Sequence, residues 1–199
     1  MSSPAATLSP LDLPPGCVLG IDPGSHKLGW GIVAPQGTGL RYVASGCIVP
    51  GGNLGLPERL GRIYDQLVLL FHRYPCRALA VESAFLHENP RTALVLGQAR
   101  GLPVALAASR GMPVHEYPPA LVKRRVVGSG RAEKSQMRAM IQLLLALPEA
   151  PGEDEADALA VAIAHLRAHA FSEQVGAADS STPAQALWLA QLHASKARR

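Results

Sequence analysis

The sequence predicts an α/β fold in which a mixed sheet carries helices on both faces. Three observations lead to this prediction. Short apolar runs of strand length come first and are joined by turns that contain glycine. Segments with helical spacing then alternate with further short apolar runs. The chain has 199 residues, which suits one domain better than two.

The first three strands are expected near the N-terminus. Residues 17–21 form a short apolar run that ends in the turn-forming sequence Asp22-Pro-Gly-Ser. Residues 28–33 and 41–49 are typical of two further strands. Because the connections are short and contain glycine, the three strands should form an antiparallel meander.

The rest of the core alternates helices with strands. An apolar run at residues 78–81, closed by Glu82, predicts a fourth strand, and residues 113–117 predict a fifth. Pro103 lies inside one predicted helix and should kink or break it. The spacing of apolar residues predicts helices at about residues 56–74, 90–109, 119–127, 132–147 and 154–168.

The folded domain is expected to span residues 17–170. Residues 1–16 are rich in proline and small polar residues, which indicates a flexible N-terminal extension. Residues 171–199 are expected to form a flexible C-terminal tail, in which Thr182 and Pro183 could begin a short helix.

Composition excludes several classes of protein. Apolar residues make up 48% of the chain, but no apolar run approaches membrane-spanning length and no secretory signal is visible. We therefore expect a cytoplasmic protein without membrane contact. Cys17, Cys47 and Cys76 are far apart and form no CxxC pair, so we expect small buried residues in a reducing compartment.

Positive charge is concentrated in one stretch of the sequence. The net charge of the chain is only +4. Between Pro118 and Arg138, Glu133 is the single acid among many basic residues. A solvated charged face is the usual explanation of such a run, but a run as one-sided as this one also points towards a polyanionic partner. The basic residues of the run are Lys123, Arg124, Arg125, Arg131, Lys134 and Arg138.

Four acids are candidates for one catalytic cluster. Asp22 and Glu82 stand where predicted strands end, and sites of α/β sheets form at such ends. Asp154 and Asp157 are three residues apart at a predicted helix start, which puts both on one face. Two divalent ions held by such carboxylates can stabilise both the attacking and the leaving oxygen in phosphodiester hydrolysis.

The residues alone leave other interpretations of these acids open. Asp22 before Pro-Gly is equally explained as a plain turn residue. Acids in a first helical turn also favour the helix dipole for structural reasons. Periodicity cannot separate Asp154 and Asp157 from Glu153 and Glu155, because the helix that follows is apolar nearly all round.

Five segments in order carry a resemblance over about residues 17–170. They are Val18–Ser25 with Gly29–Gly31, Ala80–Ser83 with Phe85, Leu96–Gly101, Val126–Gln136 and Asp154–Ala160. In their residues and in their order they resemble the motifs of the RuvC family of Holliday-junction resolvases. The resemblance implies an RNase H-like fold, and it makes the catalytic, metal-binding acids Asp22, Glu82, Asp154 and Asp157.

The resemblance also implies cofactors and partners. It implies two divalent ions, Mg²⁺ or Mn²⁺, in each active site, a four-way DNA junction as substrate, and the RuvA and RuvB branch-migration proteins as partners. It further implies a homodimer in which Leu96–Gly101 belongs to the dimer helix. Small residues such as Gly97 and Gly101 would permit close helix approach there, although for these residues taken alone ordinary packing within one subunit is the favoured explanation.

The same resemblance suggests residues that contact DNA. Lys123 and Lys134 match basic residues that hold the scissile region, and Phe85 matches an aromatic residue that stacks on bases. We expect further phosphate contacts from the basic run, by Arg124, Arg125 and Arg131.

Three other functions deserve comparison. An RNase H-like nuclease acting on RNA or another branched nucleic acid would share the Asp22 motif without needing the basic segment. A kinase of the actin-like type also begins with a similar strand and turn, but it needs a second domain for which this chain is too short. A non-catalytic junction-binding protein would have lost one of the four acids, and none is missing.

Overall fold

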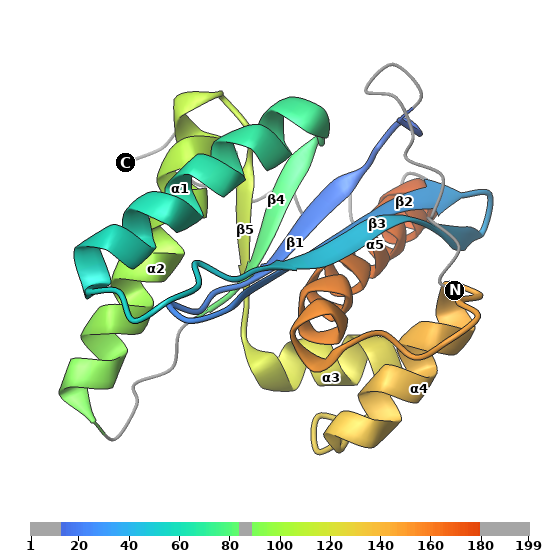
Figure 1. Cartoon of the computed structure of the whole chain (residues 1–199). Helices are drawn as coiled ribbons and strands as arrows, with labels where there is room; N and C mark the ends of the chain where they lie inside the picture. Colours follow the sequence, from blue (N-terminus) through green and yellow to red (C-terminus); the bar gives the residue numbers. More distant parts are fainter. Residues whose placement is uncertain (1–12, 84–88, 180–199) are drawn as a thin grey trace, which may run out of the picture. The chain divides into compact units, whose positions relative to one another are not determined.

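The computed structural model describes residues 13–83 and 89–179. Its centre is a five-stranded sheet with strand order β3-β2-β1-β4-β5 (Figure 1). The first three strands form the predicted antiparallel meander, while β1, β4 and β5 run parallel. The mixed sheet is therefore confirmed. Its strands are β1 (Val18–Asp22), β2 (Leu28–Gln36), β3 (Gly39–Ile48), β4 (Ala78–Glu82) and β5 (Val114–Tyr117).

Helices cover both faces of this sheet, as predicted. The helices are α1 (Leu56–Arg73), α2 (Pro90–Ser109), α3 (Pro119–Val127), α4 (Lys134–Leu144) and α5 (Glu153–Asp179). On one face, α1 and α2 pack against alternate residues of the strands, including Leu19 and Leu79. On the other face, α3, α4 and the first turns of α5 pack against the intervening residues, including Val18 and Ala80 (Figure 1). Strand alternation thus separates two apolar clusters.

Helix α5 lies directly on the sheet because glycines face it. A Cβ atom added at Gly20 would lie 2.0 Å from the backbone oxygen of Ala158, and one added at Gly29 would lie 2.0 Å from that of Asp154. No side chain other than hydrogen fits at these two positions. The close approach brings the first turn of α5 next to the ends of β1 and β2.

Two helices, α4 and α5, differ clearly from their predicted extents. Helix α2 has its predicted extent and continues through Pro103, so of the kink or break expected there, the break was wrong. The proline ring is buried, and packing of the surrounding turns offsets its missing hydrogen bond. Helix α4 begins at Lys134 because Glu133 and Gln136 form a capping box, with the Glu133 N–H donating to Gln136 Oε1 at 3.0 Å. Helix α5 extends to Asp179, beyond its predicted end.

The expectation for the cysteines holds in two of three cases. Cys17 and Cys76 are buried, but Cys47 is exposed, so its predicted burial was wrong. Cys47 lies near the end of β3, at the outer edge of the sheet, where its side chain turns away from the apolar core. Within the described ranges, none of the helices is both long and apolar enough to cross a bilayer.

Some predictions concern residues outside the described ranges. They include most of the N-terminal extension, the short helix predicted from Thr182, and Phe85 with its expected contact to bases. These remain predictions.

Candidate active site

Asp22 and Glu82 lie side by side at the carboxyl ends of two inner strands of the sheet. Strands β1 and β4 are parallel neighbours, paired up to Ile21 and Val81. The next residue of each strand is one of the two acids, and both side chains are half-buried. Both belong to positions where the strands leave the sheet and expose their side chains, as the sequence predicted.

Asp154 and Asp157 come to the same place from the first turn of α5. Because Gly29 has no side chain, the Asp154 backbone lies against β2 at this residue, which pairs with Asp22 at the end of β1. Asp157 interacts electrostatically with both Asp22 and Glu82. The structure therefore brings together acids from three elements that are far apart in sequence.

Three of these acids have raised pKa values, because they are partly buried and lie near one another. Burial is the largest cause that raises the pKa of Asp22 to about 7, and the carboxylates of Asp157, Glu82 and Asp154 contribute to this rise in that order. Burial and the Asp157 charge raise the pKa of Glu82. Burial also raises the pKa of Asp157, against the opposing charge of Lys134. The chain alone leaves an excess of negative charge at this site.

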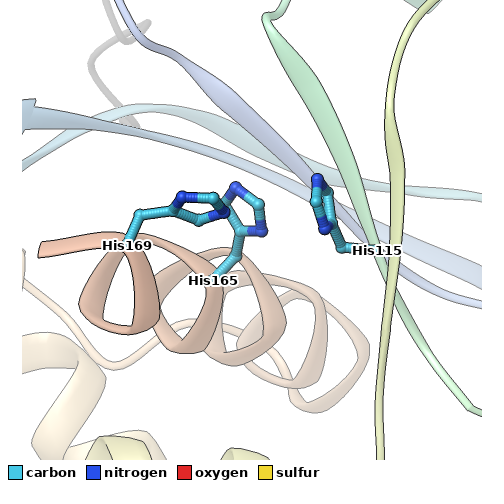
Figure 2. A group of neighbouring side chains, drawn as sticks. All are labelled: His115, His165 and His169. Atoms are coloured by element: carbon cyan, nitrogen blue, oxygen red, sulfur yellow. The ribbon is translucent and has the colours of Figure 1, made fainter. Parts of the chain in front are cut away.

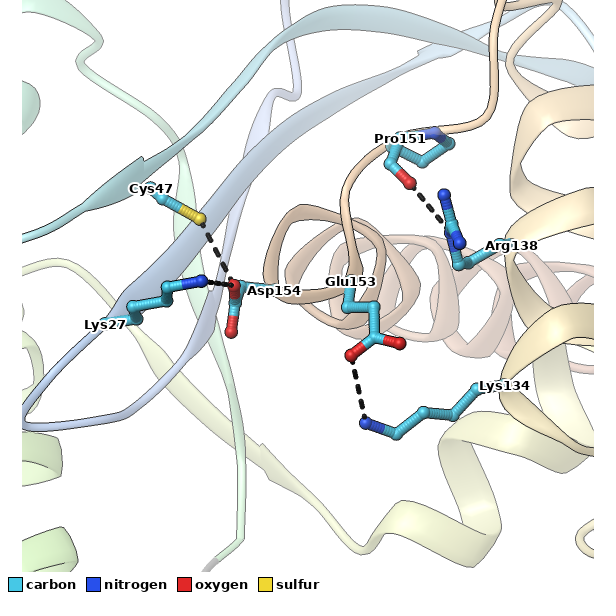
Figure 3. Close-up of polar contacts among 7 residues, drawn as sticks. All are labelled: Lys27, Cys47, Lys134, Arg138, Pro151, Glu153 and Asp154. Carbon is cyan, nitrogen blue, oxygen red and sulfur yellow. Dashed lines mark hydrogen bonds and ion pairs between the residues drawn. The ribbon is translucent and has the colours of Figure 1, made fainter.

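The neighbouring acids of the same helical turn have partners of their own. Ser45 on β3 donates a hydrogen bond to Glu155 Oε2 at 2.6 Å. Glu153 lies 3.6 Å from Lys134 Nζ on the exposed side of the turn (Figure 3). These contacts support Asp154 and Asp157 as the residues that complete the cluster, a choice that periodicity left open.

Two lysines of the basic segment border the cluster. The charge of Lys123 on α3 opposes the rise in the pKa values of Glu82 and Asp157. Lys134, the first residue of α4, does the same for Asp22 and Asp157. Their ammonium groups therefore lie within electrostatic reach of the carboxylates, where a phosphate approaching the cluster would meet them.

The arginines of the basic run occupy different places. Arg124 and Arg131 are exposed. Arg125 instead places its guanidinium 5.2 Å from the centre of the Tyr117 ring and donates a hydrogen bond to the Ala164 carbonyl at 3.4 Å. Exposed arginines suit phosphate contact, whereas Arg125 also ties α3 to α5.

Two residues that contact Asp154 had no predicted role. Lys27 Nζ lies 3.6 Å from Asp154 Oδ2, and the Cys47 thiol donates a hydrogen bond to the same oxygen at 3.7 Å (Figure 3). Lys27 follows the Asp22 turn closely in sequence, so its proximity to that motif was a usable signal. Cys47 carried no such signal, because only the pairing of β2 with β3 brings it near.

The donor set of the site fits hard divalent cations. Its ligand atoms are carboxylate oxygens, which Mg²⁺ and Mn²⁺ prefer. Burial and the neighbouring carboxylates raise the pKa of Asp22, and a bound cation would favour its charged form. Asp22, Glu82, Asp154 and Asp157 are the residues that would hold such ions.

Comparisons with known proteins agree with this geometry. Residues 18–165 match the family model described as crossover junction endodeoxyribonuclease RuvC. A protein of that name from Geobacter sp. (strain M21) is 48% identical over 155 residues, which cover 78% of this chain and 94% of the relative. Another, from Anaeromyxobacter dehalogenans (strain 2CP-1), is 51% identical over 156 residues, covering 78% and 83%.

Solved structures show the same similarity in space. RuvC of T. thermophilus in complex with a Holliday junction substrate superposes with a TM-score of 0.74 at 34% identity, covering 78% of this chain and 96% of that one. The yeast mitochondrial Holliday junction resolvase shares the fold, with a TM-score of 0.55 at 13% identity over 75% of this chain and 78% of that one. The architecture is thus the RNase H-like α/β fold. The chain belongs to the RuvC family of crossover junction endodeoxyribonucleases.

Proposed function

We propose that this chain is a structure-selective endonuclease that resolves Holliday junctions by paired, symmetric, metal-dependent nicks in DNA recombination and repair. One observation carries the proposal: the carboxylate cluster at the ends of β1 and β4 is bordered by Lys123 and Lys134. Membership of the RuvC family, one member of which is known in complex with a Holliday junction, supports the choice of substrate.

The cluster would act on the scissile phosphate through bound cations. Two Mg²⁺ or Mn²⁺ ions held by the four acids would stabilise negative charge on the attacking and leaving oxygens of an in-line displacement. Lys123 and Lys134 would bind the phosphates beside the cut and so position the strand. The partial burial of Asp22 would limit water and strengthen these electrostatic contacts.

The products would be ends that can be sealed. Attack of water on the scissile phosphate, with the 3′ oxygen as the leaving group, would leave a 5′-phosphate and a 3′-hydroxyl. Equal nicks at symmetric positions need two active sites related by two-fold symmetry, which a homodimer supplies.

The exposed face of α2 supports such a dimer. Gly97 and Gly101 are exposed, and a Cβ atom at either position would meet nothing within 4 Å among the residues that the structure describes. Leu94 on the same helix is 65% exposed. Packing within one subunit therefore does not account for these small residues, whereas close approach of a second α2 would.

RuvA and RuvB are the proposed partners, in the cytoplasm, where the chromosome lies.

The decisive assay compares DNA structures. Purified protein is incubated with a synthetic mobile four-way junction and Mg²⁺ or Mn²⁺, beside linear duplex and RNA hairpin controls. We expect paired symmetric nicks in the junction alone. Equal cutting of linear duplex, or failure to nick the junction in pairs, would refute the resolvase function. Preferential cutting of the RNA hairpin would favour the alternative of an RNA-directed nuclease.

Variants test the site separately from the substrate. Asp22→Asn and Asp157→Asn should abolish cutting and still bind the junction, because each removes a carboxylate ligand and leaves the DNA-contacting lysines in place. Asp65→Asn, an exposed acid on α1, is the matched control and should cut like the parent protein. Near-parental cutting by either cluster variant would show that the site is wrongly assigned.

A further inference from the structure

A cavity lies beside the carboxylate cluster, on the face of the sheet that α1 and α2 cover. Its volume is about 440 Å³, near the lower end of the range for small-ligand pockets. Three segments that are far apart in sequence line it: the turn that follows Asp22, the first turn of α1 and the first turns of α2 (Figure 1). The turn contributes Lys27, whose Nζ lies 3.6 Å from Asp154 Oδ2, so the cavity adjoins the cluster.

Basic side chains line this cavity from all three segments. They are His26 and Lys27 of the turn, Arg59 of α1 and Arg91 of α2. Among the residues that the structure describes, no acidic side chain lines the cavity. Cationic groups gathered in a concave site create a positive potential there, because each adds to the field of the others. The cavity is therefore suited to an anionic ligand.

Arg59 is the best placed of these groups to bind an anion. Its side chain is half-buried, and its Nη1 lies 2.8 Å from His26 Nδ1. None of the ion pairs between described residues involves it. Its Nε N–H is buried and has no acceptor among those residues. Such a donor is unfavourable until an acceptor arrives, and the planar guanidinium matches the geometry of phosphate oxygens.

The side chains matter more here than the N-terminus of α2. Asn89 Oδ1 accepts hydrogen bonds from the backbone N–H groups of Arg91 at 2.9 Å and Thr92 at 3.4 Å, so these two donors already have an acceptor. Val95 and Leu96 are half-buried and form an apolar wall of the cavity. An apolar wall next to cationic groups fits a phosphate that carries a sugar, since the sugar packs against the wall and the charges bind the phosphate.

We propose that this cavity binds a backbone phosphate of the DNA strand, on the other side of the carboxylate cluster from Lys123 and Lys134. The inference rests on the proposed junction cleavage and adds a second phosphate contact to it. Lys123 and Lys134 belong to α3 and α4, which cover the opposite face of the sheet from α1 and α2.

Phosphate contacts on both sides of the acids would fix the register of the strand. A strand that crosses the carboxyl ends of β1 and β4 would be bound by the two lysines on one side and by Arg59 and Arg91 on the other, with the scissile phosphate between them. Phosphate contacts of this kind position a strand without reading its sequence. Arg59 is thus a positioning residue and does not touch the reacting atoms.

Inorganic phosphate tests the cavity without DNA. Side-chain NMR of the metal-free full chain follows the histidine rings while phosphate replaces chloride at constant ionic strength. The His26 signals, identified by their loss in His26→Gln, should shift and saturate, and Arg59→Gln should abolish the saturation. His115 and His165 serve as internal references, because their rings pack against each other between β5 and α5, with centroids 4.5 Å apart (Figure 2). A linear shift of His26 that is equal in parent and variant would show that the cavity binds no phosphate.

Junction binding in the presence of a chelator tests the role of the cavity. Arg59→Gln and Arg91→Gln should each weaken binding and flatten the plot of log affinity against log salt by about one unit. Arg91 is exposed, so its substitution leaves the fold intact. Arg41→Gln is the matched control and should keep the parental slope, because the exposed Arg41 pairs with Ala34, beyond the opposite end of β1 from Asp22.

The two measurements separate the possible failures. Parental slopes in both cavity variants would overturn the proposal, and saturable phosphate binding would then indicate a free phosphorylated compound as the ligand. A flatter slope in either cavity variant, with a parental slope in Arg41→Gln, would support it. A parent chain that does not bind the junction would instead refute the proposed function and with it the DNA source of the phosphate, whereas the titration would still show whether the cavity binds the anion.

Discussion

Removing the charge of Asp22 should stabilise the metal-free protein. In the folded chain the pKa of Asp22 is raised from 3.8 to about 7 by burial and by the neighbouring carboxylates. The folded state therefore holds this proton more tightly than the unfolded state does. The protonated Asp22 therefore contributes to the stability of the fold. This contribution is fully present below the unfolded pKa of about 3.8 and is lost as the pH rises to about 7. Above that range the carboxylate opposes folding in the absence of metal.

The size of this effect follows from the interval between the two pKa values. One pKa unit corresponds to about 1.4 kcal/mol, so the interval sets an upper bound of about 4 kcal/mol. Because the side chain is only half-buried, solvent screening reduces this, and we expect about 2 kcal/mol. For a chain of this length that corresponds to a rise of about 4–8 °C in melting temperature for Asp22→Asn.

Thermal unfolding followed by circular dichroism measures this rise. With a chelator at pH 8, Asp22→Asn should melt about 4–8 °C above the parent chain, and the difference should shrink towards zero near pH 4. Saturating Mg²⁺ should stabilise the parent chain more than the variant, because the cation neutralises the charge that the variant lacks. The exposed Asp65→Asn serves as the control and should melt like the parent. Equal melting temperatures at pH 8, or a difference independent of pH, would refute the electrostatic reasoning.

Three further predictions test the surroundings of the cluster. Gly29→Ala should lower junction cleavage at least about a hundredfold, because the new Cβ would displace the first turn of α5; Gly61→Ala, in open space on α1, is the control, and equal activity of the two would contradict this. Ser45→Ala should remove the hydrogen bond to Glu155 and lower the melting temperature by about 2–4 °C, whereas an unchanged value in calorimetry would show that the bond contributes nothing. Lys134→Ala should weaken junction binding and flatten the plot of log affinity against log salt by about one unit, and an unaltered slope would count against phosphate contact.

The sequence determined much of this structure because the relevant signals are local. Turn chemistry after β1 and apolar runs of strand length predicted the meander, and helical spacing predicted the helices on both faces. Asp22 and Glu82 could be recognised because each is the last residue of a short buried strand. The ordered motifs identified the family before any contact between distant residues was known.

Packing between distant elements decided the rest. Helix α5 is apolar nearly all round, so its sequence did not specify which acids of its first turn would face the strand ends. The glycines of β1 and β2 let α5 lie on the sheet backbone, and that contact sets the rotation of the helix. It turns Glu155 towards Ser45 and leaves Asp157 to interact with Asp22. The same contact brings Lys27 and Cys47 to Asp154, because a sheet places residues side by side that the chain holds far apart.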